Sequence, residues 1–499
     1  MSNVFSFPQT LIGLIDSRAA AQPEASAVNH LSYYALSSAS RAVAARLLER
    51  GLKPGDRVAV YSENSVDVVL AYLGIFRAGA VAVPVNALYS PPELEGVLKD
   101  ADTKICLASA ARRASLPATS ARLVLDIGQV AHSGAERSAA GGRDLELSPG
   151  DPALLSYTSG STGHPRGAMM SHGNLVQISR QITRAFEWTP RDRLLLALPL
   201  FHAAGLYGNL FPALWAGGHV QLLKRFNADA VLEALSQGAA TMFFGVPTMF
   251  VRILDAARPG RPLSGIRLMV SGSSSLSPEL HQRFLSTFGI SIVERYGSTE
   301  MGSVLANSRR GPREPGEVGF PLDGVRARLV TPTGEEPPPG EPGELAIAGP
   351  SVFLGYWRNE RSTAEAVVTD SAGTRWFRTG DIATYDVERG FKLIGRLKDV
   401  IINGGFKVYA AEVERCLEEV PGVVAAAVVG TPDAGRGEVP VAFVEVTTGF
   451  SEQVALSVLR QSLASFKVPR AVHVVQALPR TATQKIEKWR VRQQAAALS

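Results

Sequence analysis

Short apolar runs rich in β-branched residues alternate with helical segments over most of this 499-residue chain. Between residues 57 and 109 the order is RVAVY, a helical stretch from Ser65 to Ala78, AVAVPV, the helical SPPELEGVLKDA, and KICLAS. The alternation resumes with DRLLLALPLF, HVQLLK, a helix from Ala228 to Ser236, TMFFGVP and GIRLMVSG. Strands separated by helices in this way indicate a mostly parallel sheet covered by helices. The predicted class is therefore α/β.

The composition changes in the second half of the chain. Proline and glycine gather in RRGPREPGEVGFPLDG and TPTGEEPPPGEPGE, between short strands such as VRARLV and GELAIAG, which predicts an antiparallel β subdomain with tight turns. After Gly395 a new series of strands and helices fills about 100 residues, enough for a small α/β domain. We expect a large N-terminal domain of helix-covered sheets over residues 1–395 and a small, mobile C-terminal domain over residues 396–499.

Charge and hydropathy exclude several classes of partner. The net charge of +5 comes from 51 basic and 46 acidic residues without lysine or arginine runs, so no nucleic-acid surface is indicated. The chain has no basic leader and no apolar run approaching the roughly 18 residues of a membrane span.

Cys106 and Cys416 lack metal-ligand spacing and suit a reducing compartment. We expect a cytoplasmic protein, and leave open whether it is a homo-oligomer.

The stretch YTSGSTGHPRG, residues 157–167, is the strongest local motif. Its glycines let backbone N–H groups converge on an anion, and its hydroxyl side chains can donate to the same anion. It is not a GxxxxGK[ST] loop, because Pro165 takes the place of the second glycine and the strand-like AMM follows Gly167. Ser171 is placed to cap the next helix. The alternative is a serine-glycine surface linker, which would not be expected directly after a buried strand such as ALLSY.

This loop resembles the signature of the adenylate-forming superfamily, which includes acyl-CoA synthetases, stand-alone adenylation domains and firefly luciferase. Further stretches match the family's motifs in the family's order: PLFHAAGL (199–206), VSGSSSL (270–276), ERYGSTE (294–300), GEVGFP, FLGYW, WFRTGD (376–381), GRLKDVIINGGFKVYAAEVE (395–414) and LPRTATQKIEK (478–488). The resemblance covers nearly the whole chain. It implies an enzyme that activates a small carboxylic acid with ATP and Mg²⁺ to an acyl-AMP and then transfers the acyl group to coenzyme A.

The resemblance also implies which residues would hold the nucleotide. Thr299 would contact the α-phosphate, Glu300 would bind Mg²⁺, and Asp381 would accept hydrogen bonds from the ribose, with Arg396 assisting. Tyr296 would stack on adenine. The remaining nucleotide or cofactor residues are the phosphate loop with Thr158, Ser159, Gly160, Ser161, Thr162, Gly163 and Arg166, the stretch Gly272, Ser273 and Ser274, and Glu294, Arg295 and Gly297 beside Tyr296.

Five further positions take their expected roles from the same resemblance. Lys485 matches the family's catalytic lysine, and Lys398 matches the hinge residue of the C-terminal domain. His202 borders the acyl and pantetheine channels in the family, although a histidine packed at the end of a buried strand is the plainer interpretation. Gly404 and Gly405 would let the pantetheine arm approach the backbone, and they also suit a hairpin turn.

Several positions depart from the family's usual form, and the acid stays open. Arg166 replaces a lysine, Gln484 a glycine and Ala410 a proline. A similarity to malonyl-CoA synthetases suggests that Arg295 pairs with a second carboxylate of the substrate, but Ala204 stands where those enzymes carry a second histidine. A medium-chain or aromatic acid is the alternative, since the chain also offers Phe201, Trp215, Phe243 and Phe244.

Two other functions remain as rivals. A stand-alone adenylating enzyme would pass the acyl group to a carrier protein or an amine rather than to coenzyme A. A nucleotide-binding protein that has lost catalysis would explain Gln484 and Arg166, but it would not be expected to retain Lys485, Glu300 and Asp381.

Overall fold

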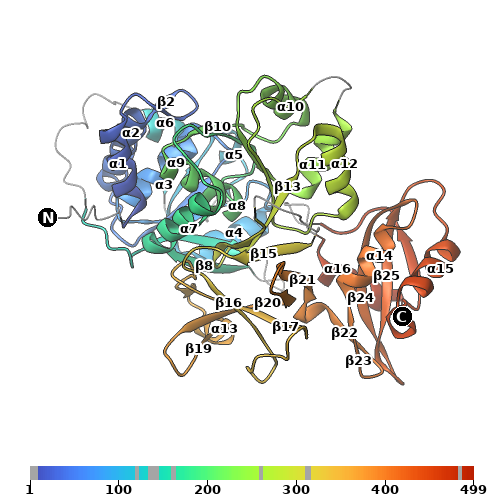
Figure 1. Ribbon diagram of the computed structural model, residues 1–499. Coiled ribbons are helices and arrows are strands. Elements are labelled where there is room, and N and C mark those ends of the chain that lie inside the picture. The colour runs from blue at the N-terminus through green and yellow to red at the C-terminus, as the bar shows by residue number, and fades with distance from the viewer. Residues whose placement is uncertain are drawn as a thin grey trace. The chain divides into compact units, whose positions relative to one another are not determined.

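The computed structural model describes residues 9–117, 123–132, 145–158, 165–257, 262–308, 316–480 and 486–498. The chain divides into two compact units (Figure 1). The first, here the N-terminal unit, holds Met1–Ala327 and Ile347–Phe377, and the second, the C-terminal unit, holds Arg328–Ala346 and Arg378–Ser499. Because the chain passes between the units several times, this division does not test a single boundary at residue 395, which stays a prediction.

One sheet of the N-terminal unit has seven strands in the order β18-β8-β7-β4-β3-β5-β6. The strands β3, β4, β5, β6 and β7 run parallel to one another, whereas β8 pairs antiparallel with both β7 and β18. The predicted strands and the return of the chain after the glycine-rich loop are thereby confirmed. The bounds are β3 Arg57–Tyr61, β4 Val81–Pro84, β5 Thr103–Ala108, β6 Leu123–Asp126, β7 Pro152–Thr158, β8 Arg166–Ser171 and β18 Gly355–Tyr356.

A second sheet of this unit follows the order β15-β14-β13-β12-β11-β9-β10-β1-β2. Its centre, from β13 to β1, is parallel, and the hairpin of β13 and β14 turns one edge antiparallel. The carboxyl ends of the parallel strands therefore share one edge, where α/β sheets bind their ligands. The bounds are β1 Ser26–Val28, β2 Leu31–Ser32, β9 Arg193–Leu196, β10 His219–Leu222, β11 Met242–Gly245, β12 Leu268–Ser271, β13 Ile292–Ser298, β14 Gly302–Ala306 and β15 Glu317–Pro321.

The helices of this unit begin where the sequence supplies caps. Ser65 caps α3 by accepting from the Val68 N–H, and Ser171 forms a capping box with Asn174 at the start of α7, as predicted. The helix predicted from Ala228 to Ser236 is α10. The remaining bounds are α1 Leu11–Ala21, α2 Tyr33–Glu49, α3 Val66–Arg77, α4 Pro91–Asp100, α5 Ala110–Arg113, α6 Ile127–His132, α7 His172–Ala185, α8 Ala203–Gly205, α9 Phe211–Ala216, α11 Pro247–Asp255, α12 Pro278–Phe288 and α13 Glu360–Ala366.

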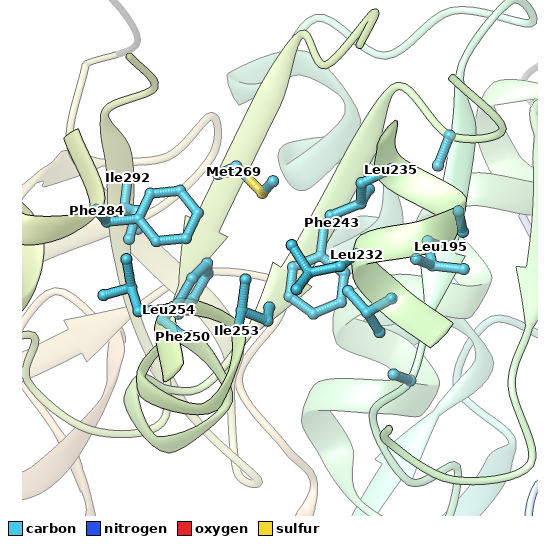
Figure 2. Packing of buried hydrophobic residues seen from close by; sticks show 14 of the residues in the cluster. Leu195, Leu232, Leu235, Phe243, Phe250, Ile253, Leu254, Met269, Phe284 and Ile292 are labelled. Atoms are coloured by element: carbon cyan, nitrogen blue, oxygen red, sulfur yellow. The ribbon is translucent and has the colours of Figure 1, made fainter. Parts of the chain in front are cut away.

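A large apolar cluster joins one face of the second sheet to helices α10, α11 and α12. Figure 2 shows Phe243 and Met269 from the strands beside Phe250 and Phe284 from the helices. The ring of Phe250 makes edge contacts with Phe243 and Phe284 at centroid distances of 5.9 and 5.3 Å. Phe243 therefore lies in this core, which corrects the expectation that it lines an acyl pocket.

The C-terminal unit contains two sheets. Strands β16, β17, β20 and β21 follow one another in the first, and β23-β22-β25-β24 with β26 beside β25 form the second, against which α14 and α15 pack. Strand β19 belongs to the N-terminal unit and pairs with the first residues of β20, Arg375 to Phe377, which also belong to that unit. The two sheets confirm the predicted β subdomain and the second α/β series. The bounds are β16 Arg326–Val330, β17 Gly343–Ala348, β19 Val367–Thr369, β20 Arg375–Asp386, β21 Gly390–Arg396, β22 Val400–Asn403, β23 Phe406–Tyr409, β24 Val423–Asp433, β25 Gly437–Val446, β26 Val472–Val475, α14 Ala410–Glu418, α15 Glu452–Ser462 and α16 Lys488–Leu498.

Among the described residues, no helix combines the length and the apolar character that crossing a bilayer requires.

The aromatic cluster generates a stability prediction. Phe250→Ala removes a fully buried ring that touches two others, so we expect the free energy of unfolding in urea to fall by about 3 to 5 kcal/mol. The control is Val251→Ala on the same helix, whose side chain is 36% exposed and whose loss should change the free energy by less than about 1 kcal/mol. Equal losses in the two variants would contradict the assigned packing.

Candidate functional site

The strands on either side of the glycine-rich loop are tightly paired. Thr158 lies opposite Arg166 in the β7–β8 ladder, and the Thr158 hydroxyl donates to the Arg166 carbonyl at 3.4 Å. Thr158 and Arg166, the described residues on either side of the glycine-rich stretch, are therefore fixed within the seven-stranded sheet. The sequence-predicted loop residues Ser159, Gly160, Ser161, Thr162 and Gly163 lie outside the described residues.

Arg166 stacks on an aromatic ring. Its guanidinium carbon lies 4.7 Å from the ring centroid of Tyr356, and its buried Nε has no hydrogen-bond partner among the residues that the structure describes. The Tyr356 hydroxyl in turn donates to Glu300 Oε1 at 2.9 Å. Burial raises the pKa of Tyr356, with the Glu300 carboxylate acting in the same direction, so the phenol stays protonated and remains a donor. Arginine, tyrosine and glutamate therefore form one line of contacts from the loop to the acidic residue.

Thr299 and Glu300 occupy the turn between β13 and β14. The Glu300 carbonyl accepts from the Phe353 N–H at 2.8 Å, and the Thr299 carbonyl accepts from the Tyr207 hydroxyl at 2.7 Å. At Gly297 a side chain would not fit, because a Cβ would lie 1.9 Å from the Gly302 carbonyl oxygen. These constraints hold the turn in one conformation and keep the Glu300 side chain buried.

Tyr296 lies one residue before Gly297 on β13 and is mostly buried. The stretch Gly272, Ser273 and Ser274 follows the carboxyl end of β12, which pairs parallel with β13. Ser273 has a φ of +70°, and Ser273 and Ser274 are exposed. The structure thus brings Tyr296 and this loop to the same edge of the sheet, as the sequence predicted.

Glu294 is a buried carboxylate that accepts from two backbone N–H groups. Leu276 N–H donates to Oε1 and Gly316 N–H donates to Oε2, each at 3.0 Å. Burial raises the pKa of Glu294 to about 7; Glu317 acts in the same direction, whereas the two N–H groups oppose the shift. With both oxygens engaged, Glu294 is placed to fix the loop after β12 rather than to contact a nucleotide directly.

Arg295 points to the opposite side of β13 and is only 8% exposed. Its Nη1 donates to the Gly208 carbonyl at 2.7 Å, and its guanidinium carbon lies 4.9 Å from the Phe244 ring centroid. Burial lowers the pKa of Arg295 to about 10. In the part of the chain that the structure describes, no acidic side chain forms an ion pair with it.

His202 precedes α8 and caps it. Its Nδ1 accepts from the Ala204 N–H at 3.2 Å, so in the neutral ring the hydrogen resides on Nε2. Gly205 permits this turn, because a Cβ there would lie 2.1 Å from the Pro199 carbonyl oxygen. The imidazole orientation is therefore set by the backbone.

The C-terminal unit carries its own group of predicted residues. Arg396 lies opposite Asp381 in the β20–β21 ladder and donates from Nε to Asp381 Oδ1 at 2.7 Å. Lys398 follows in a short 3-10 turn, Leu397–Asp399, and burial lowers its pKa. Gly404 and Gly405, with φ of +59° and +85°, form the turn between β22 and β23, and a Cβ on either would meet nothing within 4 Å.

Lys485 and Gln484 lie outside the described residues. The residues that flank them are paired, since Arg480 and Ile486 form an antiparallel bridge. The predicted role of Lys485 therefore stays a prediction.

Two residues at this site were not predicted from the sequence. Tyr356 belongs to FLGYW and Tyr207 directly follows PLFHAAGL, so both lie within or beside matched motifs. The motifs could have drawn attention to both tyrosines, but not to their partners. Glu300 is 56 residues from Tyr356 along the chain, and Thr299 is 92 residues from Tyr207.

The buried Glu294 generates a pH prediction. Its folded-state pKa of about 7 lies above the ordinary value of 4.5, so between these values the folded protein holds a proton that the unfolded chain has lost. The free energy of unfolding therefore contains a component that falls as the pH rises from about 5 to 7. We expect Glu294→Gln to remove this component. The free energy of unfolding of the wild type minus that of the variant, measured by urea titration, should therefore decrease as the pH rises through this window.

The exposed Glu279 on α12 supplies the control. Glu279→Gln should leave the shape of the pH profile unchanged. A wild-type profile parallel to that of Glu294→Gln from pH 5 to 8 would contradict the raised pKa.

Two family models match the chain. The model described as "AMP-binding enzyme" matches residues 15–357, and the model described as "AMP-binding enzyme C-terminal domain" matches residues 412–485. The first alone covers more than half of the sequence.

Individual relatives agree with these matches. A feruloyl-CoA synthase from Amycolatopsis sp is 38% identical over 95% of this chain and 97% of its own length. An oxalate–CoA ligase from Arabidopsis thaliana is 33% identical over 96% and 97%. The crystal structure of ATP-bound MatB from Rhodopseudomonas palustris superimposes with a TM-score of 0.88 and 34% identity over 97% of this chain and 98% of that one. The chain therefore belongs to the AMP-binding enzyme family, within the adenylate-forming acyl-CoA ligase superfamily.

Proposed function

We propose that this protein is an ATP-dependent acid–CoA ligase that forms an acyl-AMP and pyrophosphate and then transfers the acyl group to coenzyme A. The observation that carries the proposal is the Thr299–Glu300 turn, which contacts from Tyr207, Phe353 and Tyr356 hold in place. Relatives named as CoA ligases match over nearly their whole length, which favours coenzyme A over a carrier protein or an amine as the acceptor.

The first half-reaction joins two anions, so the site must supply positive charge and hydrogen-bond donors. Mg²⁺ in nucleotide enzymes is commonly held by one or two carboxylates together with the phosphates, rather than by a full set of protein ligands. Glu300 fits this pattern: it is a single carboxylate oriented by Tyr356, and among the described residues no cluster of three or more acidic, histidine or cysteine side chains offers a complete metal site. When bound, the metal would neutralise phosphate charge.

The other nucleotide roles follow from the same motifs. Tyr296 and the stretch from Gly272 to Ser274 would receive adenine, and the Thr299 side chain would contact the α-phosphate. Asp381 would accept from the ribose hydroxyls with Arg396 assisting, which the short Arg396–Asp381 hydrogen bond supports by orienting the carboxylate. Arg166 would add positive charge behind the phosphate loop from its position over Tyr356.

The C-terminal residues would serve both half-reactions in turn. Lys485 would bring a cation to the carboxylate and α-phosphate during adenylation. Lys398 would act as the hinge, and Gly404 and Gly405 would admit the pantetheine arm, which their open surroundings support. We keep residues 396–499 as the proposed mobile domain.

The environment of Arg295 supports the hypothesis that the substrate acid carries a second anionic group. A buried guanidinium is costly without a counter-charge, and its described partners are a carbonyl and an aromatic face. A carboxylate or sulfonate on the substrate would supply that charge. An aromatic acid is the second candidate, because a relative at 38% identity is named feruloyl-CoA synthase and Phe244 lies against Arg295.

A panel of acids tests both the reaction and its substrate. Pyrophosphate release should be measured with malonate, oxalate, ferulate and octanoate, with and without coenzyme A, and acyl-CoA should be identified by mass. Arg295→Met should lower kcat/KM for the dicarboxylic acids by about 100-fold, since the lost charge pair is buried. It should change the value for a neutral-tailed acid by much less.

If the enzyme prefers ferulate and Arg295→Met is as active as the wild type, the proposal that the substrate carries a second anionic group is wrong. The same result would still support the ligase activity. Failure of every acid to release pyrophosphate would contradict the ligase itself.

Lys485→Ala tests the assignment of the catalytic lysine. We expect acyl-AMP formation to fall at least about 100-fold, because a cation at the developing charge is lost. Thiolation of supplied acyl-AMP should stay within about threefold, because that step does not need this lysine. The control is Arg490→Ala, which removes a half-exposed cation from α16 and should preserve both steps. Adenylation by the Lys485 variant at the parent rate would show that the assignment is wrong.

A further inference from the structure

The segment after α8 is a π-helix, Leu206–Leu210, which continues into α9. All five of its residues are buried. A π-turn is rare and is found frequently at functional sites, because the extra residue redirects side chains that an α-helix would place elsewhere. The question is what this π-helix redirects.

Two groups of the π-helix reach the strand β13 and its turn. The Tyr207 hydroxyl donates to the Thr299 carbonyl at 2.7 Å, and the Gly208 carbonyl accepts from Arg295 at 2.7 Å. Consecutive residues of the π-helix therefore contact the turn that presents Thr299 and the strand residue that faces the proposed acid.

Burial, aided by the Glu300 carboxylate, raises the pKa of Tyr207. The phenol therefore stays protonated and donates to the Thr299 carbonyl. One hydroxyl of the buried π-helix is thus bonded to the turn that carries Thr299.

We propose that Tyr207 is a positioning residue for adenylation: its hydroxyl fixes the turn that carries Thr299 to the buried π-helix. This inference rests on the proposed function, since it assigns Thr299 to the α-phosphate. Tyr207 itself does not touch the reacting atoms. Without the hydroxyl, the Thr299 carbonyl loses its described side-chain donor and the turn is free to shift relative to the π-helix.

Tyr207→Phe tests the proposal against Tyr33→Phe as the matched control. Tyr33 is equally buried, and its hydroxyl donates to the Gly218 carbonyl at 2.8 Å; among the described residues it forms no hydrogen bond to β7 or to β13. Both variants remove one buried hydroxyl and retain the ring. Each should be compared with wild type by acid-dependent pyrophosphate–ATP exchange, by thiolation of supplied acyl-AMP, and by urea unfolding.

We expect Tyr207→Phe to lower kcat for adenylation at least tenfold, with KM for the acid changed less than threefold and thiolation changed less than twofold. Tyr33→Phe should keep all three values near those of wild type. If the wild type catalyses exchange and Tyr207→Phe has the same kcat, the positioning role is wrong and the proposed function stands. Equal losses in both variants, in step with their stability, would also overturn it. A wild type that catalyses no exchange with any acid would instead refute the proposed function, and this inference with it.

Discussion

The hydrogen bond from Tyr356 to Glu300 connects the two sheets of the N-terminal unit. Tyr356 belongs to β18 and is thereby part of the seven-stranded sheet, whereas Glu300 lies in the turn at the end of β13. The Phe353 N–H binds the Glu300 carbonyl in the same region. Because a buried polar group without a partner is costly, neither sheet can shift there without loss of stability. The acidic side chain proposed to hold Mg²⁺ is therefore oriented by both sheets at once.

This connection explains how the chain accommodates Arg166 where its family usually has lysine. A planar guanidinium stacks on the face of Tyr356, at 4.7 Å from the ring centroid, while the same ring donates to Glu300. The cation is then held behind the acidic residue by packing as well as by charge. An arginine at this position is consistent with a functional site and does not require that catalysis has been lost, which weakens the case for a decayed nucleotide-binding protein.

The regular elements could be predicted because their signals are local. The helix Ala228–Ser236 and the return strand after the glycine-rich loop depend on periodicity, caps and a proline within a few residues. The division into units could not be predicted in this way, because residues 328–346 join a unit whose other residues begin at 378. The partners of Tyr207, Glu294 and Tyr356 escaped prediction for the same reason. Each is a contact between segments that only the tertiary fold brings together, and family motifs name residues without naming partners.

The alternation of side chains along β13 explains why one short motif can serve two substrates. Glu294 and Tyr296 lie on the face that also packs Ile292 into the core of α10 to α12, and Glu294 fixes the loop proposed to receive adenine. Arg295 lies on the other face, against Gly208 and Phe244, where the acid is proposed to bind. The strand then ends in the turn that presents Thr299 and Glu300. Because Glu294, Arg295 and the Thr299–Glu300 turn follow one another along one strand and its end, the spacing between the proposed adenine, acid and phosphate contacts is set by β13 itself.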